Sequence, residues 1–401
     1  MKINRFTIQN FFLYLYAFSL NIENFNPTGY FSISKLAAIL YLISIVPSFK
    51  FYIFLSTRSL YFFWPIIFFF VYLTIISIAN INYYSARFID IAILQNILIF
   101  IVIVNHARRD QLILERAMLA FAIGSIFTLM LILLGVGSGF SDEGTKIGRL
   151  TFFDAGINEL GIKLATGSLI IVISAFQNTL KLNKLRYLML IFVPFIYITV
   201  LQTGSRTAFA VPILAGFIWF FYRTLISRHK FIALITGIGL SAITVVPIVF
   251  LVLQSGALNI IIERFTLTGG AGDFSETGRF TLWIGFFYLL RENLIFGNGF
   301  SGFDLITFNY FGFLESPHNV ILEIMLYTGL IGLSAYLLFL YRVFIATLIM
   351  YKYDRNLLPA LLIPSILAYV LILQGLSEKV VWLILSYIIG TFLFSSKNYK
   401  R

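Results

Sequence analysis

Long apolar segments recur along almost the whole chain, and they constrain the fold more than any other feature. Several of them approach the ~20 residues that a helix needs to cross the hydrocarbon core of a bilayer. Only 11% of the 401 residues are charged and 60% are hydrophobic, whereas a soluble domain averages roughly 25% charged residues. The sequence therefore predicts an all-α, polytopic integral membrane protein, with residues 1–401 forming a single transmembrane domain.

About twelve apolar segments are expected to span the membrane, which puts both termini on one side. With the termini in the cytoplasm, most of the 29 basic residues fall in inner segments, in agreement with the excess of Lys and Arg in cytoplasmic loops. This bias explains the net charge of +12, so nucleic acid is not an expected partner. The first segment is expected to be retained, because no small-residue cleavage site accompanies it. The expected spans are residues 7–22, 32–49, 60–78, 88–105, 117–136, 158–177, 187–203, 207–222, 231–253, 329–351, 357–376 and 380–396.

The longest connection, residues 254–317, is expected to form a large periplasmic or extracellular loop. Loops of this length are usually functional or disordered. Within it, residues 280–290 are apolar but too short to span a membrane, which favours an interfacial segment in a folded loop. A shorter polar loop, residues 137–158, is expected on the same side. No Cys is present, which excludes disulfides and Cys-based metal sites.

His318 is the histidine that the predicted topology places on the external side. It follows Pro317, which can open a helix in its first turn, so we expect His318 near a helix N-terminus. The positive end of a helix favours the neutral imidazole, which can accept a proton from a hydroxyl group. The alternative is a histidine that only caps a helix at the membrane surface. His106 and His229 lie in basic cytoplasmic segments, where we expect solvated side chains.

Several arginines are expected on the same external side. Arg206 lies in a very tight turn between two apolar spans, at membrane depth, where a charge is costly and usually functional. Arg149 precedes the sixth span, and Arg279 precedes the interfacial segment. A guanidinium group matches phosphate oxygens with a planar fork, and no metal-binding motif accompanies these arginines, so they favour a metal-independent phosphate or pyrophosphate site. For Arg264 and Arg291, lipid contacts or salt bridges are the simpler explanation, and substrate binding is the alternative.

Lys163 lies inside the sixth expected span. An ionisable group within the membrane is a functional candidate. Glu159 lies one turn earlier on the same helix face, however, and a Glu–Lys pair at this spacing is also a simple neutralising contact. Both interpretations stay open.

A longer motif joins these residues: His318-Asn319, nine residues, and then Gly329-Leu330-Ile331-Gly332. This pattern is similar to the H-N-x9-G-x-x-G signature of the O-antigen ligase and polymerase superfamily, and the resemblance covers about residues 140 to 340. The segments around Gly278-Arg279 and Leu294–Phe300 resemble its large periplasmic loop, with Asn293 where proline is usual. Thr203–Arg206 looks like its G-S-R turn, and Arg149 with Asn158 resembles an element before a span. Gly329 and Gly332 are expected to begin the tenth span and to permit close helix packing.

The resemblance implies a GT-C-like glycosyltransferase that needs no metal or other cofactor and acts on the external face of the bacterial cytoplasmic membrane. Its donor would be an oligosaccharide on undecaprenyl pyrophosphate, and its partners would include the lipid bilayer, a chain-length regulator and a flippase. His318 would be the general base, and Arg206 and Arg279 would complete the catalytic set. The implied substrate-binding residues are Arg149, Asn158, Lys163, Asn319, Arg291 and Arg264.

The superfamily contains two activities. A Wzy-type polymerase transfers a glycan from its lipid carrier to the next lipid-linked repeat unit of an O-antigen or capsule, and a ligase transfers it to lipid A-core. The 45 Phe and 22 Tyr give a composition typical of AT-rich polysaccharide clusters, which favours the polymerase. A flippase for lipid-linked oligosaccharides is a third possibility, but transporters tend to show repeated halves, and we find no repeat.

Overall fold

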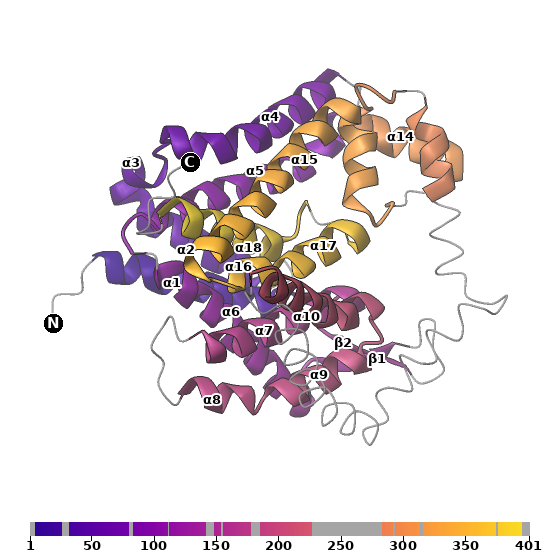
Figure 1. Ribbon diagram of the computed structural model, residues 1–401. Helices are drawn as coiled ribbons and strands as arrows, with labels where there is room; N and C mark the ends of the chain where they lie inside the picture. Colours follow the sequence, from indigo (N-terminus) through magenta and orange to yellow (C-terminus); the bar gives the residue numbers. More distant parts are fainter. Residues whose placement is uncertain are drawn as a thin grey trace.

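The structure is a computed structural model, and it describes residues 5–25, 32–79, 83–110, 112–141, 148–153, 155–177, 185–226, 283–291, 293–312, 316–373 and 376–394. These residues are mainly helical, which confirms the expected class; the exception is one short antiparallel hairpin (Figure 1). The elements are α1 (Arg5–Ser19), η1 (Leu20–Ile22), α2 (Ile33–Ile45), η2 (Val46–Ser48), α3 (Phe49–Tyr52), α4 (Thr57–Ala79), α5 (Tyr83–His106), α6 (Leu112–Leu133), β1 (Ser138–Ser141), β2 (Arg149–Phe152), α7 (Ile157–Phe176), α8 (Leu185–Leu190), α9 (Val193–Gln202), α10 (Arg206–Ile226), α14 (Gly299–Phe311), α15 (Val320–Asp354), α16 (Leu358–Leu361), α17 (Ile363–Ile372) and α18 (Lys379–Phe394).

The lengths of the described helices identify a multi-pass membrane protein. Five of them are long and apolar enough to cross a membrane: Ile33–Tyr52, Thr57–Ala79, Leu112–Leu133, Ile157–Phe176 and Val320–Asp354. Shorter apolar helices cover most of the other expected spans. The expected total of twelve stays a prediction, and the ninth expected span, residues 231–253, lies outside the described residues.

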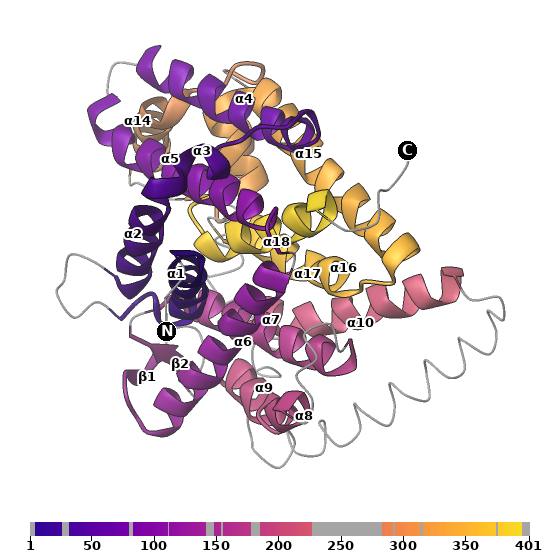
Figure 2. The same ribbon diagram turned by 90° about the vertical axis from the view of Figure 1, so that its left-hand side faces the viewer.

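The helices form two groups that are joined by the C-terminal helices. Figures 1 and 2 show α4, α5, α14 and α15 together on one side of the molecule and α6 to α10 on the other. Between them, α18 packs against α5 and α15, and α17 packs against α7, α10 and α15. Residues 380–391 of α18 are all buried, as expected for a helix that is apolar on every side. α18 therefore lies in the core of the fold.

The contact between α4 and α15 depends on a proline. Pro65 lies inside α4 and has no N–H to donate to the carbonyl of Tyr61, one turn earlier. Arg342 of α15 supplies the missing donor, because its Nη1 donates to the Tyr61 carbonyl. The guanidinium carbon of Arg342 also lies 3.9 Å from the centre of the Tyr61 ring. A polar backbone group inside the apolar part of the fold is thereby satisfied.

His106 differs from the sequence-based expectation of a solvated side chain. It is the last residue of α5 and is fully buried. Its Nδ1 lies 3.0 Å from the hydroxyl of Tyr41, and its ring meets Tyr52 edge to face. The prediction was wrong because the neighbouring aromatic residues fold over the end of α5. His229 lies outside the described residues.

Two parts of the expected external loops contain regular secondary structure. The loop at residues 137–158 contains the β1–β2 hairpin, in which Ser138 pairs with Phe152. In the long loop, residues 283–290 are helical as expected for the interfacial segment. A second helix, α14, follows after residues 291–298; further interfacial helices were expected in this loop, but the sequence did not predict where this one lies.

Candidate functional site

Most of the predicted site residues in the described part of the chain lie at or near the beginnings of helices and strands. Arg149 begins β2, Arg206 begins α10, and His318 lies two residues before the start of α15. Arg291, in contrast, directly follows the helical residues 283–290. In Figure 1, α14 and the hairpin lie on the right-hand side of the molecule, whereas α3 and α8 lie on the left.

His318 lies close to a helix N-terminus, as predicted, but Pro317 does not open the helix. Asn319 is the N-cap of α15, and its Oδ1 accepts hydrogen bonds from Ile321 N at 3.0 Å and Leu322 N at 3.2 Å. These bonds satisfy two of the N–H groups that a helix start leaves without partners. The helix consequently starts two residues after His318.

The backbone before α15 has an unusual geometry. His318 has a φ of 47°, in the left-handed region that few non-glycine residues adopt. Its N–H donates to the Oγ of Ser316 at 3.2 Å. Trp283, at the start of the helical residues 283–290, donates its indole N–H to the carbonyl of Pro317 at 2.8 Å. The segment that carries His318 is thus fixed from both sides.

A backbone contact joins the turn before α14 to α15 near Gly329. Gly329 has φ 60° and ψ −160°, which breaks the helix after residues 320–328. Leu330 N donates to Leu294 O at 2.9 Å, and Asn298 N donates to Leu326 O at 2.9 Å. We call this contact, between residues 294–298 and residues 326–331, the backbone clasp.

The two glycines of the clasp leave no room for side chains. A Cβ at Gly297 would come within 2.5 Å of Gly329 N. A Cβ at Gly329 would overlap the carbonyl of Ile295 and come within 2.7 Å of Gly297 N. The non-helical backbone at Gly329 separates two helical parts of α15, and the expectation that a span begins there stays a prediction. The close neighbour of Gly329 is the backbone of residues 295–297, whereas the atoms nearest to a Cβ at Gly332 belong to Thr328 of its own helix.

The clasp is anchored to α4 and α14. Tyr72 of α4 donates its hydroxyl to Phe296 O at 3.2 Å, and Ser77 Oγ accepts from Phe300 N at 3.3 Å. Tyr327 packs edge to face against the rings of Phe300 and Phe303. The first part of α15, which carries His318 at its start, is therefore held by both helices.

Arg149 and the turn that carries Arg206 are brought together. Arg149 is 7% exposed, and its Nε donates to the carbonyl of Thr203 at 2.9 Å. Thr203 and Ser205 are buried, whereas Arg206 is half-buried at the start of α10. This hydrogen bond fixes the plane of the Arg149 guanidinium next to the turn.

The turn rests on α7 without intervening side chains. A Cβ at Gly161 of α7 would come within 2.8 Å of the Ala208 Cβ and 2.9 Å of the Thr203 Oγ1. The small residue at position 161 thus allows the turn to approach the α7 backbone closely. Asn158 lies at the beginning of the same helix and is half-buried.

Lys163 makes the predicted contact with Glu159, and it is 4% exposed. It also pairs with Glu23, at 3.5 Å from Oε2. These contacts support the neutralising role, and a role in substrate binding stays a prediction. Arg291 is exposed, with its guanidinium carbon 4.9 Å from the centre of the Tyr288 ring. Arg279 and Arg264 lie outside the described residues.

Several of these features could not be found from the sequence pattern. The bonds from Trp283 to Pro317 and from Arg149 to Thr203 join segments far apart in the chain. Glu323 is another missed residue: it is 8% exposed in the first turns of α15, and its Oε1 accepts from the Tyr327 hydroxyl at 3.0 Å. Among the described residues, no group of three or more His, Asp or Glu is placed to hold a metal ion.

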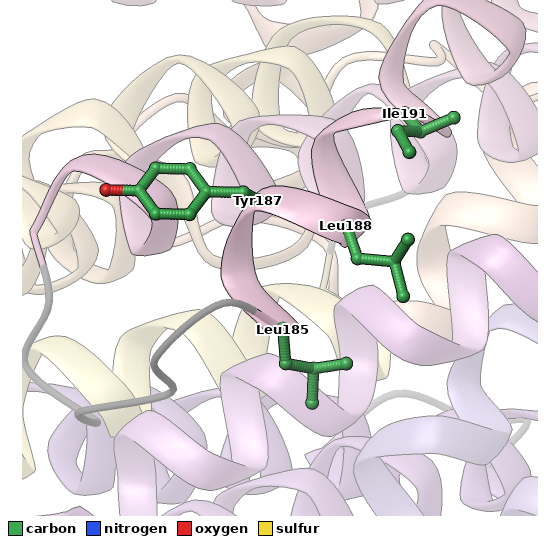
Figure 3. A pocket seen from close by; sticks show the side chains of 4 residues that line it. All are labelled: Leu185, Tyr187, Leu188 and Ile191. Carbon is green, nitrogen blue, oxygen red and sulfur yellow. The ribbon is translucent and has the colours of Figure 1, made fainter.

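An apolar pocket lies away from this site, on α8 and the residue that follows it. Figure 3 shows its lining, which consists of Leu185, Tyr187, Leu188 and Ile191. Leu185, Leu188 and Ile191 carry no group for acid–base chemistry. All four side chains are exposed, and they lie on or next to the apolar helix Tyr187–Gln202. None of the candidate site residues lines this pocket.

The fold and the site define a class of protein: a multi-pass helical membrane protein with a histidine before one helix, an arginine at the start of another helix and a second arginine at the start of a strand. The comparison with known families specifies this class further. Residues 187–337 match the family model described as O-antigen ligase, so this part of the chain is similar to that family. The match covers Arg206 and His318 and confirms the resemblance seen in the sequence. No curated protein and no solved structure shows a significant match to the chain.

Proposed function

We propose that the protein is a glycosyltransferase that polymerises a bacterial surface polysaccharide on the external face of the cytoplasmic membrane. The family domain implies an enzyme that transfers a lipid-linked glycan. The observation that carries the proposal is the fixed position of His318, two residues before α15 and between the contacts of Trp283 and Asn319. A site of this kind suits a reaction that requires one well-placed base.

In the proposed reaction, His318 accepts the proton of an acceptor hydroxyl. The hydroxyl oxygen attacks the anomeric carbon of the donor glycan, and the bond from that carbon to undecaprenyl pyrophosphate breaks. Arg206 and Arg279, with Arg149 next to the turn, stabilise the negative charge on the departing pyrophosphate. Asn158, Lys163, Asn319, Arg264 and Arg291 complete the proposed substrate contacts. The proposal includes no metal ion, because arginines carry the neutralising charge.

The acceptor distinguishes two reactions of this class. In the polymerase, the acceptor is the next lipid-linked repeat unit, whereas in the ligase it is lipid A-core. The amino-acid composition favours the polymerase, and the description of the matching family favours the ligase. We propose the polymerase as the main activity and the ligase as the alternative.

The surface glycan of a deletion strain tests this proposal. Loss of a polymerase leaves single repeat units on the lipid core, and re-expression of the protein restores long chains. Loss of a ligase leaves a core without repeat units and polymer on the carrier lipid. An unchanged surface glycan in the deletion strain contradicts both activities.

A further inference from the structure

Two arginines lie over the aromatic rings of the short connection between α2 and α4. This connection contains α3, on the left-hand side of Figure 1. The guanidinium carbon of Arg108 lies 4.7 Å from the centre of the Phe51 ring and 4.4 Å from the centre of the Phe54 ring. The guanidinium carbon of Arg109 lies 4.3 Å from the centre of the Phe51 ring, so two positive charges share one ring. We call residues 49–55 together with these two arginines the arginine–aromatic surface.

The ends of apolar helices place the arginine–aromatic surface at the edge of the hydrocarbon core. The segments Ile33–Tyr52 and Thr57–Ala79 are each long and apolar enough to cross a membrane, and the apolar helix Ile91–His106 ends next to α3. The side chains of Phe49 and Phe54 are exposed. Exposed aromatic side chains beside cations at this level are typical of segments that lie in the interface of a bilayer.

Hydrogen bonds to α1 and α5 hold this surface in place. The Nδ2 of Asn105 donates to the carbonyl of Tyr52 at 2.8 Å, and the hydroxyl of Tyr52 donates to the Oε1 of Gln9 at 2.6 Å. The Nη1 of Arg108 donates to the carbonyl of Phe51 at 3.2 Å. The α3 backbone and the Arg108 guanidinium are thus oriented by the protein itself, which reduces the ordering that a ligand must impose when it binds.

The charges and the geometry suit an anion. A guanidinium that lies over a ring uses its flat face for that contact, whereas its N–H groups lie in the plane and match phosphate oxygens. Residues 46–60 contain two basic residues and no Asp or Glu. The next carboxylate in the chain, Asp110, pairs with Arg116 at 3.5 Å and accepts from Leu112 N at 2.9 Å. Positive charge is therefore in excess where exposed apolar side chains meet the membrane surface.

We propose that the arginine–aromatic surface is a binding site for an anionic phospholipid. The headgroup phosphate binds between Arg108 and Arg109, and the exposed side chains of Phe49, Phe54 and Leu55 contact the acyl chains. Inorganic phosphate lacks the second of these contacts, and a zwitterionic lipid brings an ammonium group close to the two arginines. The predicted topology places this surface on the cytoplasmic side, so the lipid site is separate from the candidate site for glycan transfer.

Native mass spectrometry of the purified full-length protein in detergent tests the proposal. The protein is titrated with phosphatidylglycerol, with phosphatidylcholine and with inorganic phosphate. The wild type should bind phosphatidylglycerol more tightly than either of the other two. Each arginine that is removed should weaken the affinity for phosphatidylglycerol about fivefold, so the double variant Arg108→Gln with Arg109→Gln should bind it more than about tenfold more weakly.

Lys352→Gln is the matched control. Lys352 is exposed, and its Nζ lies 5.3 Å from the centre of the Tyr353 ring, so the variant removes a cation over an aromatic ring that no second arginine shares in the described part of the chain. Its affinity for phosphatidylglycerol should equal that of the wild type. Arg109→Gln alone keeps the bond from Arg108 to Phe51 and provides the measurement where the double variant fails to fold.

Four results would overturn the proposal. The first is equal affinity of the wild type for the two lipids, and the second is an affinity for phosphatidylglycerol that is the same in the wild type and in the arginine variants, or as low in Lys352→Gln as in those variants. The third is binding of inorganic phosphate as tight as that of the lipid, which would assign the arginines to a free anion. The fourth is failure of Arg109→Gln to fold, which would assign this arginine to the fold. The measurement requires no transferase activity, so its outcome is independent of the proposed function.

Discussion

Replacement of Gly329 by alanine is the most direct perturbation of the backbone clasp. The backbone at this position lies in a region that is essentially restricted to glycine, so a side chain costs ~1–3 kcal/mol in backbone strain. The added Cβ overlaps the carbonyl of Ile295. Relief of this overlap requires the two segments of the clasp to move apart. Loss of the hydrogen bonds Leu330 N to Leu294 O and Asn298 N to Leu326 O adds about 1 kcal/mol each. The expected destabilisation is therefore about 3–5 kcal/mol.

Thermal unfolding of the purified protein in detergent, together with glycan transfer, measures this effect. Gly216→Ala in α10 is the matched control, since a Cβ at position 216 meets no atom within 4 Å and alanine favours a helix interior by roughly 0.5–1 kcal/mol. Gly329→Ala should unfold at a clearly lower temperature than Gly216→Ala and lose most of its activity. An unfolding temperature and a transfer rate equal to those of the wild type refute the role of the clasp.

Three further substitutions test how the site residues are held. Asn319→Ala removes the N-cap of α15 and should lower the free energy of unfolding by about 1 kcal/mol, with recovery in Asn319→Asp; equal unfolding temperatures in all three proteins would exclude the cap. Trp283→Phe removes the bond to Pro317 and should slow glycan transfer while membrane insertion stays normal; an unchanged rate would show that the bond does not position His318. Arg149→Lys loses the planar fork and should raise the KM for the donor at least about tenfold, and a KM equal to that of the wild type would exclude a role in donor binding.

The sequence predicts the membrane helices well, because each span must satisfy its backbone hydrogen bonds within one apolar segment. The start of α15 illustrates the limit. Pro317 was expected to open the helix, but the side chain of Asn319 accepts the first N–H groups and moves the start to Val320. A proline and an asparagine close together both fit a helix start, and only the geometry of the cap distinguishes them.

The glycines show a second limit of sequence reasoning. The spacing of Gly329 and Gly332 fits close helix packing, yet Gly329 accommodates a turn that begins 35 residues earlier, at Leu294. Contacts of this kind have no periodic pattern in the sequence. The same is true of the ion pairs around Lys163. Glu159 and Lys163 form a recognisable pair on one helix, whereas Glu23, which pairs with Lys163 and with Lys379, is separated from them by long stretches of chain.

The central claim is that His318 acts as the general base, and His318→Ala tests it most directly. The variant is expressed in the deletion strain, its insertion into the membrane is compared with that of the wild type, and the surface glycan is analysed. Loss of a positioned base costs ~10²–10⁴ in rate, so the account predicts normal insertion and loss of the transferred glycan. Long-chain glycan at the level of the wild type, from a normally inserted His318→Ala protein, contradicts the assignment.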